Sequence, residues 1–182
     1  MEVTVLLQAY SDGDGAALDK LGELLYPELK AMARRRVASG PGIGATTLVH
    51  ETFAQLLTGG RLSSSDRKQF FGLAATIMRR VIVDEIRYVT AGKREGKHVT
   101  LAEAVIGDDA HEKAEFLLQV DEMLSVLESE NAQHARVFEC RYFAGSTTAE
   151  TAEALEMSTR SVERAWSAAR VRMASLMDEN NP

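Results

Sequence analysis

Residues 147–162 have the sequence TTAETAEALEMSTRSV, and the pattern of this stretch is typical of a helix-turn-helix. The small side chain of Ala152 stands where two helices must approach closely. Leu155 and Met157 flank the turn between the helices, and the apolar Val162 falls inside the second helix. The stretch therefore predicts two helices joined by a tight turn near the C-terminus of the 182-residue chain.

The turn itself has one expected and one unusual residue. Ser158 precedes the second helix, and its hydroxyl is suited to cap the first free backbone N–H groups of that helix. Glu156 stands where many such turns carry glycine, because that residue adopts a positive φ. A glutamate in that conformation costs about 1 kcal/mol. Either Glu156 adopts the positive φ despite this unfavourable free energy, or the turn has a different geometry.

The second helix has two faces of opposite character. Apolar residues at helical spacing should face the core: Val162, Ala165, Trp166, Ala169, Met173 and Leu176. The opposite face, with Arg172 at its edge, suits the DNA major groove and consists of Arg160, Ser161, Glu163, Arg164, Ser167 and Arg170. Glu163 could accept a hydrogen bond from cytosine or pair with a neighbouring arginine. The alternative interpretation is an ordinary helical hairpin with a solvated outer face.

The rest of the chain carries the same helical signal. Apolar stripes predict helices over residues 3–38, with a turn at 11–15, and over 46–57, 69–89, 113–128 and 132–143, followed by 148–155 and 159–177. Asp14 is suited to cap the helix that follows the first turn. No strand-like alternation persists. The expected fold is all-α, with two small helical domains at residues 1–95 and 113–178 joined by a linker at 96–112.

Composition supports a helical intracellular protein. Hydrophobic residues make up 45% of the chain and aromatic residues only 6%, which favours helix packing over sheets. The single cysteine, Cys140, cannot form an internal disulfide, and we expect it to be a buried apolar residue in a reducing cytoplasm. We expect no signal peptide, because residues 1–4 (MEVT) lack a basic n-region, and no membrane span, because no stretch of 18 apolar residues occurs.

Charge is unevenly distributed along the chain. The net charge of -6 alone argues weakly against nucleic-acid binding, but residues 98–135 hold one basic and nine acidic residues and so account for the acidic excess. The flanking segments can therefore still present basic faces.

Three motifs, taken together and in this order, resemble the extracytoplasmic-function (ECF) sigma factors of bacterial RNA polymerase over nearly the whole chain. Residues 46–57 (TTLVHETFAQLL) resemble region 2.2 of that family. Residues 70–87, which end in DEIR, resemble regions 2.3–2.4. Residues 117–176, including ARVFECRYF at 135–143, resemble region 4. The resemblance implies a transcription initiation factor that binds core RNA polymerase and directs it to promoters.

The resemblance also implies roles for particular residues. The β′ clamp helices of polymerase would be bound through Thr47, Leu48, His50, Glu51, Phe53 and Gln55, and the β flap would be a further contact. A loop at residues 61–69 would trap a flipped base, and the −10 element would be contacted by Arg61, Lys68, Arg79, Arg80, Arg87, Lys93 and Arg94. The polar face of the last helix would bind the −35 element. For each arginine the alternative is a solvated helix surface.

Two departures from the family pattern bear on function. Members typically carry acidic residues before Leu-Val in region 2.2, but this chain has Gly44-Ala45-Thr46-Thr47. We hypothesise that phosphorylation of Thr46 or Thr47 restores the negative charge. The alternative is that Thr47 caps the helix, and Glu51 and apolar contacts bind polymerase. In the third helix Arg80 replaces a common asparagine, which predicts an unusual −10 preference.

The partners implied by the resemblance are core polymerase and promoter DNA, with an anti-sigma factor or a Ser/Thr kinase as further candidates. No cofactor, metal or catalytic role is expected. His50-Glu51 lacks the second histidine of a zinc protease, Asp108-Asp109 lacks partner ligands, and no phosphate loop or nucleophile elbow occurs. The main rival interpretation is a helix-turn-helix regulator that binds DNA without polymerase.

Overall fold

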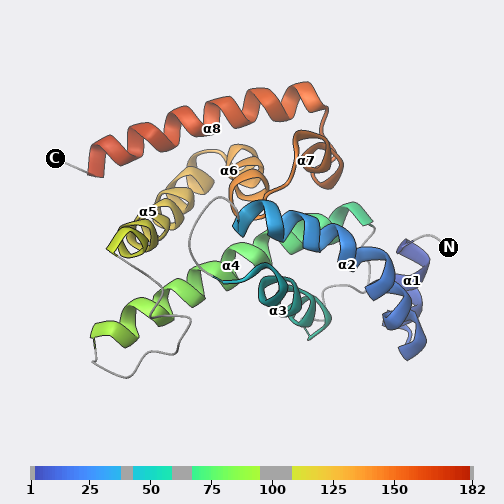
Figure 1. The fold of residues 1–182 in the computed structure, drawn as a ribbon. Helices are drawn as coiled ribbons and strands as arrows, with labels where there is room; N and C mark the ends of the chain where they lie inside the picture. Colours follow the sequence, from blue (N-terminus) through green and yellow to red (C-terminus); the bar gives the residue numbers. More distant parts are fainter. Residues whose placement is uncertain (1–2, 38–42, 59–66, 95–107, 181–182) are drawn as a thin grey trace.

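The computed structural model describes residues 3–37, 43–58, 67–94 and 108–180, and all the secondary structure in these ranges is helical (Figure 1). This confirms the predicted all-α fold. In chain order the elements are α1 (Val3–Ser11), α2 (Gly15–Val37), α3 (Ala45–Thr58), α4 (Arg67–Arg94), α5 (Asp108–Glu130), α6 (Ala132–Phe138), the π-helical turn η1 (Glu139–Phe143), α7 (Thr148–Ala154) and α8 (Thr159–Asn180).

The helix boundaries follow the predicted ones closely, except that α4 and α5 are longer and residues 139–143 form a π-helical turn instead of α-helix. Asp14 caps α2, since its Oδ1 accepts a hydrogen bond from the Ala16 N–H at 2.9 Å. Helix α4 continues to Arg94, and α5 begins at Asp108 rather than at residue 113. Acidic residues at the start of α5 favour this early beginning, because the N-terminus of a helix carries partial positive charge. The rest of the predicted linker, residues 96–107, lies outside the described residues.

The N-terminal half, α1–α4, packs its apolar stripes into one core. Helices α1 and α2 form a hairpin, and α3 packs between α2 and α4. The leucines of α2 at 21, 25 and 29 are fully buried, as are Leu48 and Leu56 of α3 and Phe70 and Met78 of α4. The predicted helical stripes in this half therefore face the core as expected.

The C-terminal half, α5–α8, packs around α6, which contacts both α5 and α8. Helix α7 packs on α8 through a small separate cluster that contains Val137, Ala152, Val162 and Ala165. The small side chain of Ala152 thus lies between the two helices of the helix-turn-helix, as the sequence predicted.

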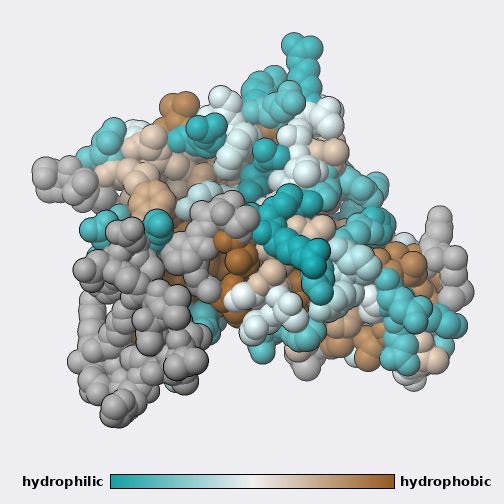
Figure 2. All heavy atoms as spheres, in the orientation of Figure 1, coloured by the Kyte–Doolittle hydropathy of each residue, from teal (hydrophilic) through white to brown (hydrophobic). Residues whose placement is uncertain are grey.

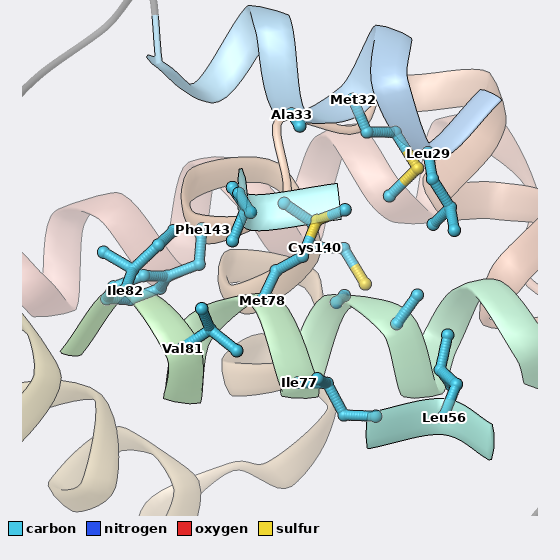
Figure 3. Packing of buried hydrophobic residues seen from close by; sticks show 14 of the residues in the cluster. Leu29, Met32, Ala33, Leu56, Ile77, Met78, Val81, Ile82, Cys140 and Phe143 are labelled. Carbon is cyan, nitrogen blue, oxygen red and sulfur yellow. The ribbon is translucent and has the colours of Figure 1, made fainter. Parts of the chain in front are cut away.

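The two halves share one hydrophobic core. Helix α4 contacts α5, α7 and η1, so the C-terminal half packs against α4. Cys140 and Phe143 of η1 are buried in the same cluster as Met32 of α2 and Met78 of α4 (Figure 3). The halves are therefore docked on each other rather than separated.

Gly145 lies where the backbones of the two halves approach each other closely. Its φ is +66°, and a Cβ there would lie 2.7 Å from the carbonyl oxygen of Met32 and 2.9 Å from the backbone nitrogen of Arg36. Both groups belong to the backbone of α2, which cannot give way as a flexible side chain would. Only glycine satisfies the conformation and the spacing together.

We expect Gly145→Ala to lower the free energy of unfolding by about 2 kcal/mol, because it adds both backbone strain and a clash with α2. Urea unfolding followed by circular dichroism measures the change. Gly22→Ala is the matched control: Gly22 lies within α2 with open space around it, and alanine there should raise stability by roughly 0.5–1 kcal/mol. Equal effects of the two substitutions would contradict the close approach at Gly145.

Candidate nucleic-acid and polymerase interfaces

Side-chain caps fix the start of both helices of the helix-turn-helix. Thr147 and Glu150 form a capping box: Oγ1 of Thr147 accepts from the Glu150 N–H at 3.2 Å, and Oε2 of Glu150 accepts from the Thr147 N–H at 2.6 Å. At the second helix, Oγ of Ser158 accepts from the Ser161 N–H at 3.1 Å. The predicted cap at Ser158 is confirmed, and the position of α8 relative to α7 is set from its first turn.

The turn between α7 and α8 has the left-handed residue that the helix-turn-helix pattern predicts. Glu156 has a φ of 54°, and it is the non-glycine residue with positive φ among the described residues. The next residue closes the turn, since the Met157 N–H donates to the Ala152 carbonyl at 2.9 Å. The turn therefore has the usual helix-turn-helix geometry and not a different one. Glu156 adopts a positive φ in it, which is unfavourable for a residue with a side chain.

We expect Glu156→Gly to raise the free energy of unfolding by roughly 0.5–1 kcal/mol, because glycine adopts positive φ without strain. The exposed ion pair between Glu156 and Lys68 is lost, but pairs of this kind contribute little. Urea unfolding measures the effect. Glu163→Gly, on the exposed face of α8, is the control and should destabilise by about 1 kcal/mol. A loss of stability in Glu156→Gly as large as in the control would contradict this account of the turn.

The face of α8 that the sequence assigned to the −35 element points away from the core. Exposed side chains on this face are Arg160, Glu163, Arg164, Ser167 and Arg170, and Ser161 is half-buried with its hydroxyl 2.8 Å from that of Ser158. Among the described residues, no ion pair or hydrogen bond engages the guanidinium groups of Arg160 and Arg164. Figure 2 shows hydrophilic to intermediate residues over the N-terminal end of α8, at the upper right of the view.

Two other arginines of α8 have partners of their own. Arg170 lies over the ring of Trp166, 5.8 Å from its centroid. Arg172 binds Glu130 of α5 at 2.7 Å and Glu179 at 2.8 Å, and the hydrogen bonds to these carboxylates raise the pKa of Arg172. Arg172 therefore joins α8 to α5, and the free positive charge of this face lies toward the start of the helix.

Helix α3 presents part of the residue set that the sequence assigned to polymerase. Thr46, Thr47, His50 and Glu51 are exposed, and Nε2 of His50 lies 3.2 Å from the Tyr26 hydroxyl. Leu48 is fully buried in the core, and Phe53 and Gln55 are half-buried. Leu48 therefore positions the helix instead of offering a surface.

The two threonines lie in the first turn of α3, which begins at Ala45. Gly44 precedes the helix, and its carbonyl accepts the first hydrogen bond, from the Leu48 N–H at 2.9 Å. Thr47 is therefore within the helix and not at the capping position, which goes against the alternative that Thr47 only caps it. Both hydroxyl-bearing side chains are open to solvent beside the positive end of the helix dipole.

The residues assigned to the −10 element are dispersed. Arg61 lies outside the described residues, and Lys93 and Arg94 fall in the last turn of α4. Arg80 is exposed. Lys68, Arg79 and Arg87 each reach a carboxylate of the C-terminal half.

Arg79 makes the most buried of these contacts. Its Nε lies 2.7 Å from Oδ1 of Asp121 in α5, and its Nη1 lies 3.5 Å from Oε1 of Glu139 in η1. The side chains of Arg79 and Asp121 are 16% and 13% exposed and that of Glu139 is 5% exposed. Thr76 and Arg136 complete the cluster, because each donates a hydrogen bond to Oε2 of Glu139 at 3.0 and 2.9 Å.

A second row of ion pairs joins the helix-turn-helix to the N-terminal half. Arg35 binds Oε2 of Glu150 at 2.6 Å and also donates to the Gly145 carbonyl. The remaining pairs in this row are Arg67 with Glu153 and Lys68 with Glu156, each at 3.3 Å. Together with the contacts of Arg79 and Arg87 to Asp121 and of Arg79 to Glu139, we call these the bridging ion pairs.

Sequence reasoning did not identify the bridging ion pairs. It placed Lys68, Arg79 and Arg87 on a DNA-binding surface and gave Arg35, Asp121 and Glu139 no role. The uneven charge along the chain was a signal for Asp121 alone, which lies in the acidic stretch 98–135, because the other carboxylates of these pairs follow that stretch. Opposite charges on two packed halves would be expected to meet.

The described helices define a class of protein: two helical halves, the second with a helix-turn-helix whose exposed face is rich in arginine. The ECF sigma factor family model matches residues 1–179, and the chain therefore belongs to this family of regulatory transcription factors. The family acts in promoter-specific initiation of transcription.

Other comparisons add little to this assignment. Among solved structures, that of CnrH in complex with the cytosolic domain of CnrY is similar with a TM-score of 0.45 and 19% identity, covering 98% of this chain and 99% of that one. No curated protein matched the sequence. In the described part of the chain, no helix is long and apolar enough to cross a membrane and no cluster of residues is suited to hold a metal ion.

Proposed function

We propose that this protein binds core RNA polymerase and directs it to specific promoters, with α8 contacting the −35 element and α4 the −10 element. The observation that carries the proposal is the pair of unengaged arginines on the exposed face of α8, in a chain that belongs to the ECF sigma factor family. The rival regulator that acts without polymerase would share the helix-turn-helix but not the need for core enzyme.

The geometry of α8 supports contact with the major groove. Arg160, Arg164 and Ser167 are separated by four and three residues and so lie on one side of the helix. The capped N-terminal end of a recognition helix is the part that reaches base edges. An arginine can bind guanine through two parallel hydrogen bonds or neutralise a phosphate.

We expect Arg164→Ala to reduce run-off transcription from a cognate promoter by roughly tenfold, because one arginine contact to a base or phosphate is lost. A genomic promoter library transcribed with core polymerase and the wild-type protein identifies the promoter. Lys113→Ala is the control, since Lys113 is exposed on α5 away from α8, and it should leave transcription unchanged. No added initiation by the wild-type protein, or no difference between the two variants, would refute this assignment.

The exposed face of α3 is the proposed contact with the β′ clamp helices of polymerase. The charge on this face is proposed to control how tightly polymerase binds. A phosphate on Thr46 or Thr47 would add about -1.5 to -2 charge at the start of the helix. The helix dipole stabilises a negative group there, and arginines of a partner can bind its oxygens in pairs. Phosphorylation by a Ser/Thr kinase would thus replace the acidic residues that this chain lacks.

We expect Thr47→Glu, and the wild-type protein treated with a Ser/Thr kinase, to bind core polymerase more tightly than untreated wild type, while the double variant Thr46→Ala/Thr47→Ala binds no better after treatment. Pull-down with purified core measures the affinities. Thr58→Glu, at the last residue of α3, adds the same charge eleven residues after Thr47 and should not increase binding. Equal affinities across the series would rule out control by phosphorylation.

A further inference from the structure

We propose that the protein has a closed state in which carboxylates of the C-terminal half form ion pairs with the cations that would otherwise bind promoter DNA. The buried side chain of Arg36 limits the stability of this closed state, so that the two halves can separate. The part that concerns DNA rests on the proposed function. The docking of the two halves and the burial of Arg36 are independent of it.

The bridging ion pairs place carboxylates where DNA phosphates would otherwise bind. Asp121 accepts from both Arg79 and Arg87, at 2.7 and 3.3 Å, and Glu156 pairs with Lys68. These three cations all belong to the set assigned to the −10 element. A cleft of about 210 Å³ opens beside Arg79 and Arg87, lined by Thr76, Arg79, Arg80, Val83, Asp84, Arg87, Asp121 and Glu139. An incoming strand would have to displace Asp121 to reach Arg79.

Arg36 is a buried charge on the docked surface that opposes closure. Its side chain belongs to α2 and is 5% exposed, and its Nε and Nη2 atoms have no hydrogen-bond partner. The ring of Tyr142 from the C-terminal half lies 5.7 Å from the guanidinium. Burial lowers the pKa of Arg36, which expresses the cost of keeping a cation away from water.

Separation of the halves would return the guanidinium of Arg36 to water. Tyr142 and the Gly145 backbone, which cover this part of α2, both belong to the C-terminal half. Opening therefore loses the bridging ion pairs and the shared apolar core but regains the hydration of a charged group. Changes at Asp121 and at Arg36 should accordingly shift the equilibrium in opposite directions.

The single cysteine provides a native reporter of opening. Cys140 is 1% exposed and lies in the cluster that α2, α4 and η1 share (Figure 3). Burial raises the pKa of its thiol to about 12. A thiol in this state reacts slowly with iodoacetamide, because the thiolate is the nucleophile and access is closed. The alkylation rate of the full-length protein therefore measures how often the halves separate.

Three variants test the proposal. Asp121→Asn removes the central bridging carboxylate and should speed alkylation of Cys140 roughly tenfold. Arg36→Met removes the buried charge with little change of volume and should slow it roughly tenfold. Glu130→Gln is the matched control: Glu130 also lies on α5 and pairs with an arginine at 2.7 Å, but that arginine, Arg172, is in the same half. Its alkylation rate should equal that of wild type.

Binding of a short fluorescent single-stranded oligonucleotide gives the second readout. Asp121→Asn should bind several-fold more tightly than Glu130→Gln, because Arg79 and Arg87 are released. The two variants lose the same negative charge, so a general electrostatic effect would raise both affinities equally. Such equality would overturn the claim that Asp121 shields these cations.

Urea unfolding of each variant decides whether alkylation reports opening. Rates that change only in proportion to the global unfolding constant would mean that Cys140 reacts from the unfolded chain, and would overturn the closed state. Equal rates in all four proteins, or faster alkylation of Arg36→Met, would also overturn it. Neither readout uses polymerase, so failure of the wild-type protein to initiate transcription would refute the proposed function and leave these measurements to decide the closed state.

Discussion

The ion pair between Arg79 and Asp121 is the contact on which the arrangement of the two halves depends. Apolar packing also joins α4 to the C-terminal half, but packing of this kind tolerates sliding and substitution. A hydrogen-bonded ion pair that is largely removed from water has one good geometry. Arg79 also contacts Glu139 and lies 5.8 Å from the ring centroid of Phe143, so a single guanidinium fixes α5 and η1 against α4.

Local features of the fold followed from the sequence because they depend on residues close together in the chain. The caps at Asp14 and Ser158 were predicted and are present, and the positive φ at Glu156 was one of two alternatives that the turn left open. Each is set by one turn of backbone and one side chain. The π-helical turn was not predicted, because the extra residue in the helix is stabilised by burial of Cys140 and Phe143 against the other half. That burial depends on contacts distant in sequence.

In the candidate interfaces, too, features set by residues close together in the chain could be predicted and those set by distant residues could not. The outward face of α8 could be predicted, because a helix with one apolar stripe must expose the opposite side. The surroundings of Arg79 could not, since its partners come from α5 and η1 and spacing within α4 says nothing about them. Leu48 shows a related limit: the sequence places it both in an apolar stripe and in a polymerase-binding motif, and the packing, which buries it fully, decides between the two.

One oxygen atom links the helix-turn-helix to the N-terminal half. Oε2 of Glu150 accepts from the Thr147 N–H, which closes the capping box of α7, and also from the Arg35 guanidinium of α2, both at 2.6 Å. Two interactions that share an acceptor polarise each other and are not independent. The energetic effects of substitutions at Thr147 and Arg35 should therefore not add. A mutation in the N-terminal half of this protein would then alter the starting turn of its helix-turn-helix without touching it.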